Sequence, residues 1–341
     1  MRLLSVKARV KQLFRFFPSS SPLSTLTPIG RDTMTDAIVP IRAKWYSPPG
    51  RWEYVPQTPY DINARYEAKS LPTSLTLLTW NVDFMERNVT KRLTAALDYL
   101  QFHAFPKYDG GQPPPCLILL QEIHISTFNT LLAHPWVQAW FMVVPGSPED
   151  WPEDASYGTV TLVARSAPLV AGGCVYFESW MHRNALVTDV GVGGGEPHLR
   201  VLRVVNTHLE SLPMGTQMRV VQMGVIANLL KKEGTLGGIV CGDMNPIAPS
   251  DETLAEQNGL SDAWEHRRDK EEDGTTWGYQ PKCKFPPRRF DKILYTKSDA
   301  IDIKDVRRMA VGLKMPSGQW VSDHCGLICQ VEVYQTTSQD T

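Results

Sequence analysis

The stretch Ile239-Val240-Cys241-Gly242-Asp243-Met244-Asn245 decides the fold, because an apolar run leads into a glycine and then into two polar side chains. We interpret the run as a buried strand that ends at the edge of a sheet. Alternation along a strand would point the side chains of Asp243 and Asn245 in the same direction, and Gly242 permits the close approach of another backbone. A carboxylate can take a proton from water, and a carboxamide can donate to a developing oxyanion. The same residues would also fit an Asx turn after a strand.

Polar side chains gather at the ends of four other expected strands. They are Asn81 and Asp83 after Leu75 to Trp80, Glu122 after Cys116 to Leu120, His208 after Leu199 to Thr207, and Ser322-Asp323-His324 before Cys325 to Val333. Polar residues are common in turns, so a single cluster after a strand would need no further explanation. Five clusters at strand ends favour a single shared polar site.

The remaining expected elements are mostly strands joined by hairpins. The further strands are Tyr157 to Ala164, Leu169 to Phe177, Ala185 to Val190, Phe290 to Tyr295 and Val306 to Val311. Apolar residues at helical spacing predict helices over Asn88 to Phe102 and Gln217 to Lys232. This pattern predicts an α/β protein in which two packed sheets carry helices on their outer faces.

Length, composition and charge limit the classes of function. The 341 residues allow one large domain or two small ones, and a hydrophobic content of 42% supports a sizeable core. No apolar run approaches the roughly 18 residues that a membrane span requires. The net charge is −1, and it becomes −7 without the six basic residues that precede Asp32. A body this acidic does not suit a protein that coats long duplex DNA, whereas recognition of one phosphate at a metal remains open.

The cysteines show no spacing that is typical of a zinc site, and most lie in apolar strand patterns. They are Cys116, Cys174, Cys241, Cys283, Cys325 and Cys329. We expect them to be reduced core residues of an intracellular protein.

The ends of the chain differ from its body. Residues 1–31 contain no acid and combine basic with apolar residues before a Ser/Pro-rich part, which fits either a mitochondrial presequence or a disordered basic tail. We expect residues 32–71 to form a linker whose aromatic residues dock on the domain surface, and residues 1–71 to be largely disordered. The globular domain is expected to span residues 72–334, before a polar tail at 335–341.

Carboxylates without a Cys/His ligand set favour a hard cation, so the expected cofactor is Mg²⁺, which Mn²⁺ could replace. Glu122 is the best single candidate ligand, because its strand is otherwise apolar and an unpaired buried charge is costly. A metal held by carboxylates and water suits phosphoryl transfer. His324 can place a positive charge against a phosphate, although it also fits a cap, and His208 alone would fit a satisfied core histidine.

Five motifs resemble those of the endonuclease/exonuclease/phosphatase superfamily, and their order and spacing match over about residues 72–334. They are Thr79-Trp80-Asn81, Leu120-Gln121-Glu122, Asn206-Thr207-His208-Leu209, Gly242-Asp243-Met244-Asn245 and Ser322-Asp323-His324. The resemblance implies a metal-dependent phosphodiesterase with a DNase I-like fold, a four-layer α/β sandwich of two packed mixed β-sheets flanked by helices.

Within the superfamily the chain is most similar to the 5′-tyrosyl-DNA phosphodiesterase family, which frees DNA 5′ ends from topoisomerase II remnants. The segments that carry this likeness are Thr79-Trp80-Asn81-Val82-Asp83, His208-Leu209-Glu210-Ser211, Thr276-Trp277, Arg289-Phe290-Asp291-Lys292-Ile293 and Ser322-Asp323-His324-Cys325-Gly326-Leu327, with Arg183-Asn184, Arg219 and Gln222. The resemblance implies a hydrolase that binds DNA 5′ ends carrying a tyrosyl adduct and a single-stranded overhang. It also implies a monomer in the nucleus, while a presequence would direct the chain to mitochondria.

The resemblance further implies roles for individual residues. The implied catalytic residues are Asn81, His208, Asp243, Asn245, Asp291 and His324, and the implied metal ligands are Asp83 and Glu122. The implied substrate contacts are Tyr157, Arg183, Ser211, Arg219, Trp277 and Phe290. Asp243 would activate the attacking water, and Asn81 and Asn245 would hold phosphate oxygens. His324 would stabilise the transition state, with Asp291 orienting its imidazole.

Two departures from the family pattern stand out. The family usually has Leu-Arg-Asp after its Gly-Asp-x-Asn motif, where this chain has Pro246-Ile247-Ala248, so one cationic contact to DNA is missing. The ubiquitin-binding domain of vertebrate members has no counterpart in residues 1–71.

Alternative functions are those of an abasic endonuclease, an RNA deadenylase or a sphingomyelinase-like enzyme of the same fold, or of a non-catalytic binding protein.

Overall fold

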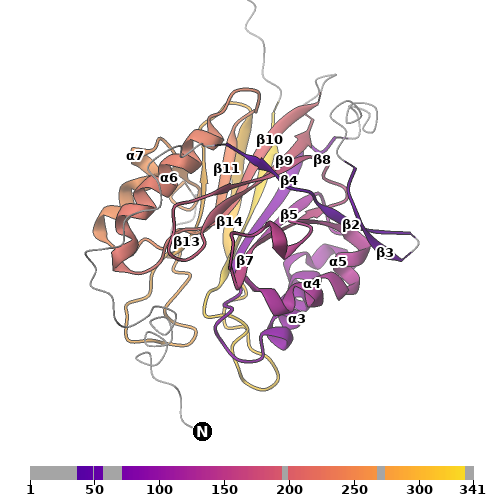
Figure 1. Cartoon of the computed structure of the whole chain (residues 1–341), viewed down its shortest axis with the longest axis horizontal. Helices are drawn as coiled ribbons and strands as arrows, with labels where there is room; N and C mark the ends of the chain where they lie inside the picture. Colours follow the sequence, from indigo (N-terminus) through magenta and orange to yellow (C-terminus); the bar gives the residue numbers. More distant parts are fainter. Residues whose placement is uncertain (1–36, 49, 57–70, 194–198, 267–272, 335–341) are drawn as a thin grey trace, which may run out of the picture.

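Two mixed β-sheets lie at the centre of the molecule, with helices on both sides (Figure 1). The computed structural model describes residues 37–48, 50–56, 71–193, 199–266 and 273–334. The N-terminal segment 1–31, much of the expected linker and the C-terminal tail 335–341 therefore lie outside the described residues. None of the described helices is long and apolar enough to cross a membrane.

The first sheet has seven strands in the order β1-β8-β9-β10-β11-β13-β12. Their bounds are β1 Val39–Pro40, β8 Leu169–Tyr176, β9 Asn184–Val192, β10 Arg200–His208, β11 Gly238–Asp243, β13 Asp291–Tyr295 and β12 Ser261–Asp262. The second sheet has eight strands in the order β14-β15-β4-β5-β7-β6-β2-β3. Their bounds are β14 Ile301–Met309, β15 Gly326–Val333, β4 Ser74–Asn81, β5 Cys116–His124, β7 Tyr157–Ala164, β6 Phe141–Val144, β2 Lys44–Ser47 and β3 Arg51–Tyr54.

The helices form two groups on opposite sides of the sheets. Figure 1 shows α6 and α7 on one side and α3, α4 and α5 on the other. Their bounds are α3 Val89–Tyr99, α4 Phe128–Ala133, α5 Pro135–Trp140, α6 Thr216–Leu230 and α7 Leu254–Gln257. Helices therefore cover both outer faces, as the sequence predicted.

Successive side chains of each central strand point in opposite directions. One set packs between the two sheets, and the other packs against the helices outside. In β4, Leu77 packs between the sheets, whereas its neighbour Leu78 packs in the cluster that includes α3. In β11, Ile239 packs between the sheets, whereas Val240 packs with residues of α6. Because both faces are buried, these strands are apolar throughout rather than alternating. The result is a four-layer arrangement of helices, sheet, sheet and helices.

Each sheet contains one parallel pair of strands, β4 with β5 and β10 with β11. Asn81 lies opposite Gln121 in the first pair, and His208 lies opposite Asp243 in the second. The carboxyl ends of parallel strands meet at one edge of a sheet, and this edge is where ligands bind in α/β folds. The polar residues that follow these strands therefore come together.

The folded part of the chain begins earlier than expected. β1 pairs with β8 in one sheet and β2 pairs with β6 in the other, so this segment joins the edges of both sheets. Ile41 and Ala43 are buried between the sheets. The boundary expected at residue 72 is therefore wrong, because strands before it already belong to both sheets. Strands of two and four residues are too short to show a clear alternation in the sequence.

Removal of residues 1–71 should destabilise the protein, because it would uncover the edges of β6 and β8 and the apolar surface beneath Ile41. Full burial of one large apolar side chain contributes about 1.5–3 kcal/mol. We expect the melting temperature to fall by about 5–10 °C, measured by calorimetry. Removal of residues 1–31 alone is the control and should leave catalysis unchanged. A shortened chain that melts with the full-length protein would show that the N-terminal strands are dispensable.

Candidate active site

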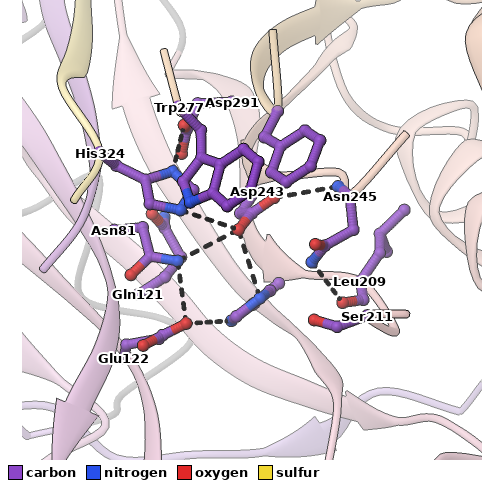
Figure 2. A network of polar contacts seen from close by, with 12 residues as sticks. Asn81, Gln121, Glu122, Leu209, Ser211, Asp243, Asn245, Trp277, Asp291 and His324 are labelled. Carbon is purple, nitrogen blue, oxygen red and sulfur yellow. Dashed lines mark hydrogen bonds and ion pairs between the residues drawn. The ribbon is translucent and has the colours of Figure 1, made fainter. Parts of the chain in front are cut away.

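Polar side chains from four strand ends and two loops meet at one edge of the sandwich. Figure 2 shows Asn81, Glu122, Asp243, Asn245 and His324 around a common centre. Asn81 and Asp243 end β4 and β11, Glu122 lies two residues before the end of β5, and Asn245 and His324 lie in loops after β11 and before β15. The structure thus brings together the residues that the sequence placed at strand ends.

The backbone after β11 is folded tightly around Asp243. Gly242 has φ +148°, and a Cβ atom there would lie 1.8 Å from the carbonyl oxygen of Thr207. The N–H of Asn245 donates to Asp243 Oδ1 at 2.9 Å, and Asn245 itself has φ +45°. The Asx turn and the polar site are therefore the same feature: the turn fixes one carboxylate oxygen and leaves the other facing the cluster.

Three side chains approach the remaining oxygen, Asp243 Oδ2. Asn81 donates from Nδ2 at 3.1 Å and His324 places Nε2 at 3.8 Å (Figure 2). His208 places Nε2 at 3.4 Å. The same Asn81 amide also donates to Glu122 Oε1 at 3.0 Å. The two sheets are thus connected through one carboxamide that contacts both acids.

His208 is held in its neutral form. Arg183 donates from Nη1 to His208 Nδ1 at 2.9 Å, so that nitrogen is an acceptor and the ring proton lies on Nε2. Burial lowers the pKa of His208 well below its usual value, and the charges of Arg183 and His324 lower it further. The 3.8 Å approach of His208 Nδ1 to Glu122 is therefore not an ion pair.

His324, in contrast to neutral His208, is positively charged. Its Nδ1 donates to Asp291 Oδ2 at 2.7 Å. Burial alone would lower the pKa of His324, but the negative charges around it, Asp291 first, outweigh burial and raise that pKa well above its usual value. A positive imidazolium therefore faces the cluster, oriented by a buried carboxylate.

The pKa of Asp243 suits a general base that works near neutral pH. Burial raises the pKa of Asp243 to about 7, although protonated His324 acts to lower it. The fraction of Asp243 that can accept a proton therefore rises as the pH rises through this value. General bases work best when their pKa lies near the operating pH.

Glu122 is aimed into the cluster by an irregularity in β5. The register against β7 shifts between Leu120 and Ile123, and Glu122 has φ +62°. Its Oε2 accepts from the backbone N–H of Phe84 at 3.0 Å. Burial raises the pKa of Glu122, and the charge of Asp323 raises it further. A largely buried carboxylate that accepts hydrogen bonds from the neutral N–H groups of Asn81 and Phe84 fits a ligand for a hard cation.

Asp83 differs from the expectation that it shares the metal with Glu122. Arg92 donates from Nη2 to Asp83 Oδ2 at 3.1 Å, and both side chains are buried. Arg92 also donates to the carbonyl oxygens of Val82 and Asp83. The charge of Asp83 is therefore already compensated, and the residue holds the loop after β4.

Ligand atoms of Asp243, Asp291 and His324 lie within 4.8 Å of one another, close enough to share a cation. Asp291 and His324 already bind each other at 2.7 Å, however, and a cation between them would break that bond. Glu122 therefore remains the better-suited ligand among the described residues.

Trp277 and Phe290 form an aromatic surface beside His324. Their rings stack with centroids 4.8 Å apart and planes 9° apart, and Phe290 lies 6.3 Å from the imidazole. Trp277 Nε1 donates to Asp323 Oδ2 at 3.0 Å, which fixes the indole. The sequence placed both residues at the substrate, and the structure brings both to the rim of the cluster.

A second aromatic group lies on the Glu122 side. Tyr157 stacks on Phe84 at 3.8 Å between centroids, and the Arg183 guanidinium lies 5.4 Å from the Tyr157 ring. Arg183 also donates to Ser211 Oγ at 3.1 Å. Phe84 was not predicted as a site residue, although its position three residues after Asn81 places it in the same loop.

Arg219 does not reach the site as a substrate contact. It is fully buried, pairs with Asp251 at 2.7 Å and donates to the carbonyl oxygens of Glu210 and Leu212. A side chain with these partners is unavailable to substrate. Arg219 instead anchors the loop that follows His208.

Comparisons with known proteins agree with this architecture. A model of the endonuclease/exonuclease/phosphatase family matches residues 78–324. The tyrosyl-DNA phosphodiesterase 2 of Gallus gallus is 24% identical over 277 residues, covering 76% of this chain and 68% of that protein. The Xenopus laevis protein of the same name is 26% identical over 272 residues, covering 76% of this chain and 66% of that protein. The chain thus matches about two thirds of the length of these relatives.

Solved structures share the fold. D. rerio TDP2 in complex with a single-strand DNA product has a TM-score of 0.60 at 21% identity, covering 76% of this chain and all of that one. The human Nocturnin catalytic domain with bound sulfate has a TM-score of 0.53 at 18% identity, covering 77% of this chain and 96% of that one. These likenesses confirm the predicted DNase I-like sandwich. With the family match over most of the chain, they show that this protein belongs to the endonuclease/exonuclease/phosphatase family, a family of phosphate-ester hydrolases.

Proposed function

We propose that the protein is a metal-dependent phosphodiesterase that hydrolyses 5′-phosphotyrosyl-DNA bonds and leaves a 5′-phosphate. Its adduct would be the remnant of topoisomerase II, and its role the repair of DNA double-strand breaks. The observation that carries the proposal is the stacked pair Trp277 and Phe290 beside the imidazolium of His324. A phosphate bound beside His324, together with a base stacked on the Trp277 indole, corresponds to one nucleotide at the end of a DNA strand. The named relatives support the same substrate.

In this proposal Asp243 takes a proton from water, and the water oxygen bonds to phosphorus as the bond to the tyrosyl oxygen breaks. Asn245 gives one amide N–H to the carbonyl oxygen of Leu209 and orients a phosphate oxygen with the other, whereas both amide N–H groups of Asn81 are taken by Glu122 and Asp243. The His324 imidazolium stabilises the negative charge that develops on the phosphate. The leaving phenol has a pKa of about 10, so it departs as a phenolate more readily than an alkoxide would.

Glu122 would hold a divalent metal, which when bound would neutralise phosphate charge. The Asn81 amide contacts Glu122 and Asp243 together and so fixes the distance between the metal ligand and the base. His208 stays neutral and donates toward Asp243, which holds the carboxylate in place without protonating it.

One assay tests the proposal. Purified protein is given a 5′-phosphotyrosyl oligonucleotide, an abasic duplex, poly(A) RNA and sphingomyelin, each with Mg²⁺ and with EDTA. We expect Mg²⁺-dependent release of tyrosine from the first substrate well above turnover of the others. Preferred cleavage of any other substrate, or full activity in EDTA, would overturn the proposal.

Trp277→Ala should reduce use of the tyrosyl oligonucleotide more than use of nitrophenyl thymidine phosphate, which has little strand to stack. Stacking on an aromatic contributes roughly 1–3 kcal/mol per base, so the ratio of the two kcat/KM values should fall by about 10- to 100-fold. Trp277→Phe should restore part of the ratio. Equal losses on both substrates with a lower melting temperature would make Trp277 a core residue and remove this support for a DNA-end substrate.

A further inference from the structure

Three side chains form a row at the rim of the site. Trp277 makes isolated antiparallel bridges with His324 on one side and with Arg288 on the other. Residues directly opposite each other in an antiparallel pair project from the same face, with neighbouring Cβ atoms about 4.5–5.5 Å apart. Arg288 is therefore the third member of a row that begins at the catalytic imidazole.

The guanidinium of Arg288 is held in place. Its Nη1 donates to the carbonyl oxygens of Pro246 and Ile247, both at 2.8 Å. Its backbone exchanges hydrogen bonds with Trp277 at 2.9 and 3.0 Å. A guanidinium has five N–H groups, and these contacts use only Nη1, so Nε and Nη2 can bind a ligand. The anchoring carbonyls belong to the segment directly after Asn245.

The charge of Arg288 is uncompensated within the described part of the chain. The adjacent Arg289 binds both oxygens of Asp262 at 2.9 and 2.8 Å and also approaches Glu265. By contrast, no described acid pairs with Arg288, whose acceptors are neutral carbonyls. An ordered, half-exposed arginine without an acid fits recognition of an anion with paired oxygens, such as phosphate.

We propose that Arg288 binds the internucleotide phosphate that follows the reacting 5′-phosphate. This inference rests on the proposed function. The DNA strand would run along the row: the reacting phosphate lies at His324, the first base stacks on Trp277, and the next phosphate meets Arg288. Contacts to phosphate set the position of a strand without reading its sequence. The site would then require a substrate of at least two nucleotides for full affinity.

The test measures binding of a 5′-phosphorylated single-stranded oligonucleotide, the product, by fluorescence anisotropy over a range of salt concentrations. Arg288→Gln keeps an N–H donor for the loop carbonyls and removes the charge. Loss of one phosphate contact to a single strand should flatten the slope of log K against log salt by about 0.7. We expect the Kd to rise by about ten-fold at low salt. Arg288→Lys should keep the slope.

Lys282→Gln is the matched control, because it removes the same charge from an exposed position in the same loop. It should leave the slope and turnover unchanged. An equal effect of Lys282→Gln and Arg288→Gln would overturn the proposal in favour of a general positive field. An unchanged slope in Arg288→Gln would also overturn it.

A kinetic comparison separates a phosphate contact from a loop anchor. In Arg288→Gln, the ratio of kcat/KM for the tyrosyl oligonucleotide to that for nitrophenyl thymidine phosphate should fall by about ten-fold. Equal losses on both substrates with a lower melting temperature would make Arg288 only an anchor for residues 246–247. The binding assay needs no turnover. If the wild type binds DNA through Arg288 but does not release tyrosine, the proposed function fails while this contact stands.

Discussion

Asp243→Asn should lower turnover of the tyrosyl oligonucleotide by about 10²–10⁴, the usual contribution of a positioned base. Asparagine keeps the size of the side chain, and its carbonyl oxygen can still accept from the N–H of Asn245. The new NH2 group would face the N–H groups of Asn81, His208 and His324 in place of an acceptor, so we expect a lower melting temperature with the fold retained. Single-turnover kinetics with a tyrosyl oligonucleotide measure the effect on the chemical step.

Asp299→Asn provides the control for this variant, since it makes the same change at an exposed carboxylate far along the chain. It should turn over at the rate of the wild type. Binding of the product oligonucleotide to Asp243→Asn should stay close to that of the wild type. Near-normal turnover in Asp243→Asn would remove this residue from the mechanism.

Glu122→Gln should raise the Mg²⁺ concentration required for half-maximal activity by at least about 10- to 100-fold. That range applies when only an outer partner of a metal ligand is removed, and Glu122 is proposed as a ligand itself. The carboxamide keeps the shape of the side chain but loses the charge that holds a hard cation. Activity should return in part at high Mg²⁺ or with Mn²⁺.

Calorimetric titration with Mg²⁺ and Mn²⁺ measures the loss of metal affinity directly, without an activity assay. Glu233→Gln, a change at an exposed position, should bind metal as the wild type does. If the metal dependence of Glu122→Gln overlays that of the wild type, Glu122 is structural and the cation lies elsewhere, with Asp243, Asp291 and His324 as the next candidates.

The sequence predicted the central strands well, because both of their faces are buried. The β7 strand has the expected bounds, and β4 and β10 differ by one residue at each end. β14 begins at Ile301 rather than at Val306, since charged and partly exposed residues such as Asp302 and Lys304 interrupt its apolar pattern. Hydrophobic periodicity follows burial, and it therefore weakens at the edges of a sheet.

The site was predicted less completely, because residue type does not determine a partner. Asp83 follows a strand as a ligand would, yet Arg92, one helical turn into α3, neutralises it. Arg219 lies on an apolar helix stripe, where a charged side chain indicates a buried partner as readily as a substrate contact; here the partner is Asp251. Only the tertiary arrangement distinguishes these cases.

The pairing of β4 with β15 has a consequence for how the chain folds during synthesis. β4 includes Asn81, β15 follows His324, and the two strands lie side by side within the larger sheet, next to its edge strand β14. The ribosome must release nearly the whole chain before this pair can form. Such long-range pairing slows folding and leaves apolar strands exposed in the meantime. A chain that terminates before β15 would lack an internal strand of the larger sheet as well as His324, the residue proposed to stabilise the transition state. We therefore expect incomplete products to aggregate rather than to act as partly active enzymes.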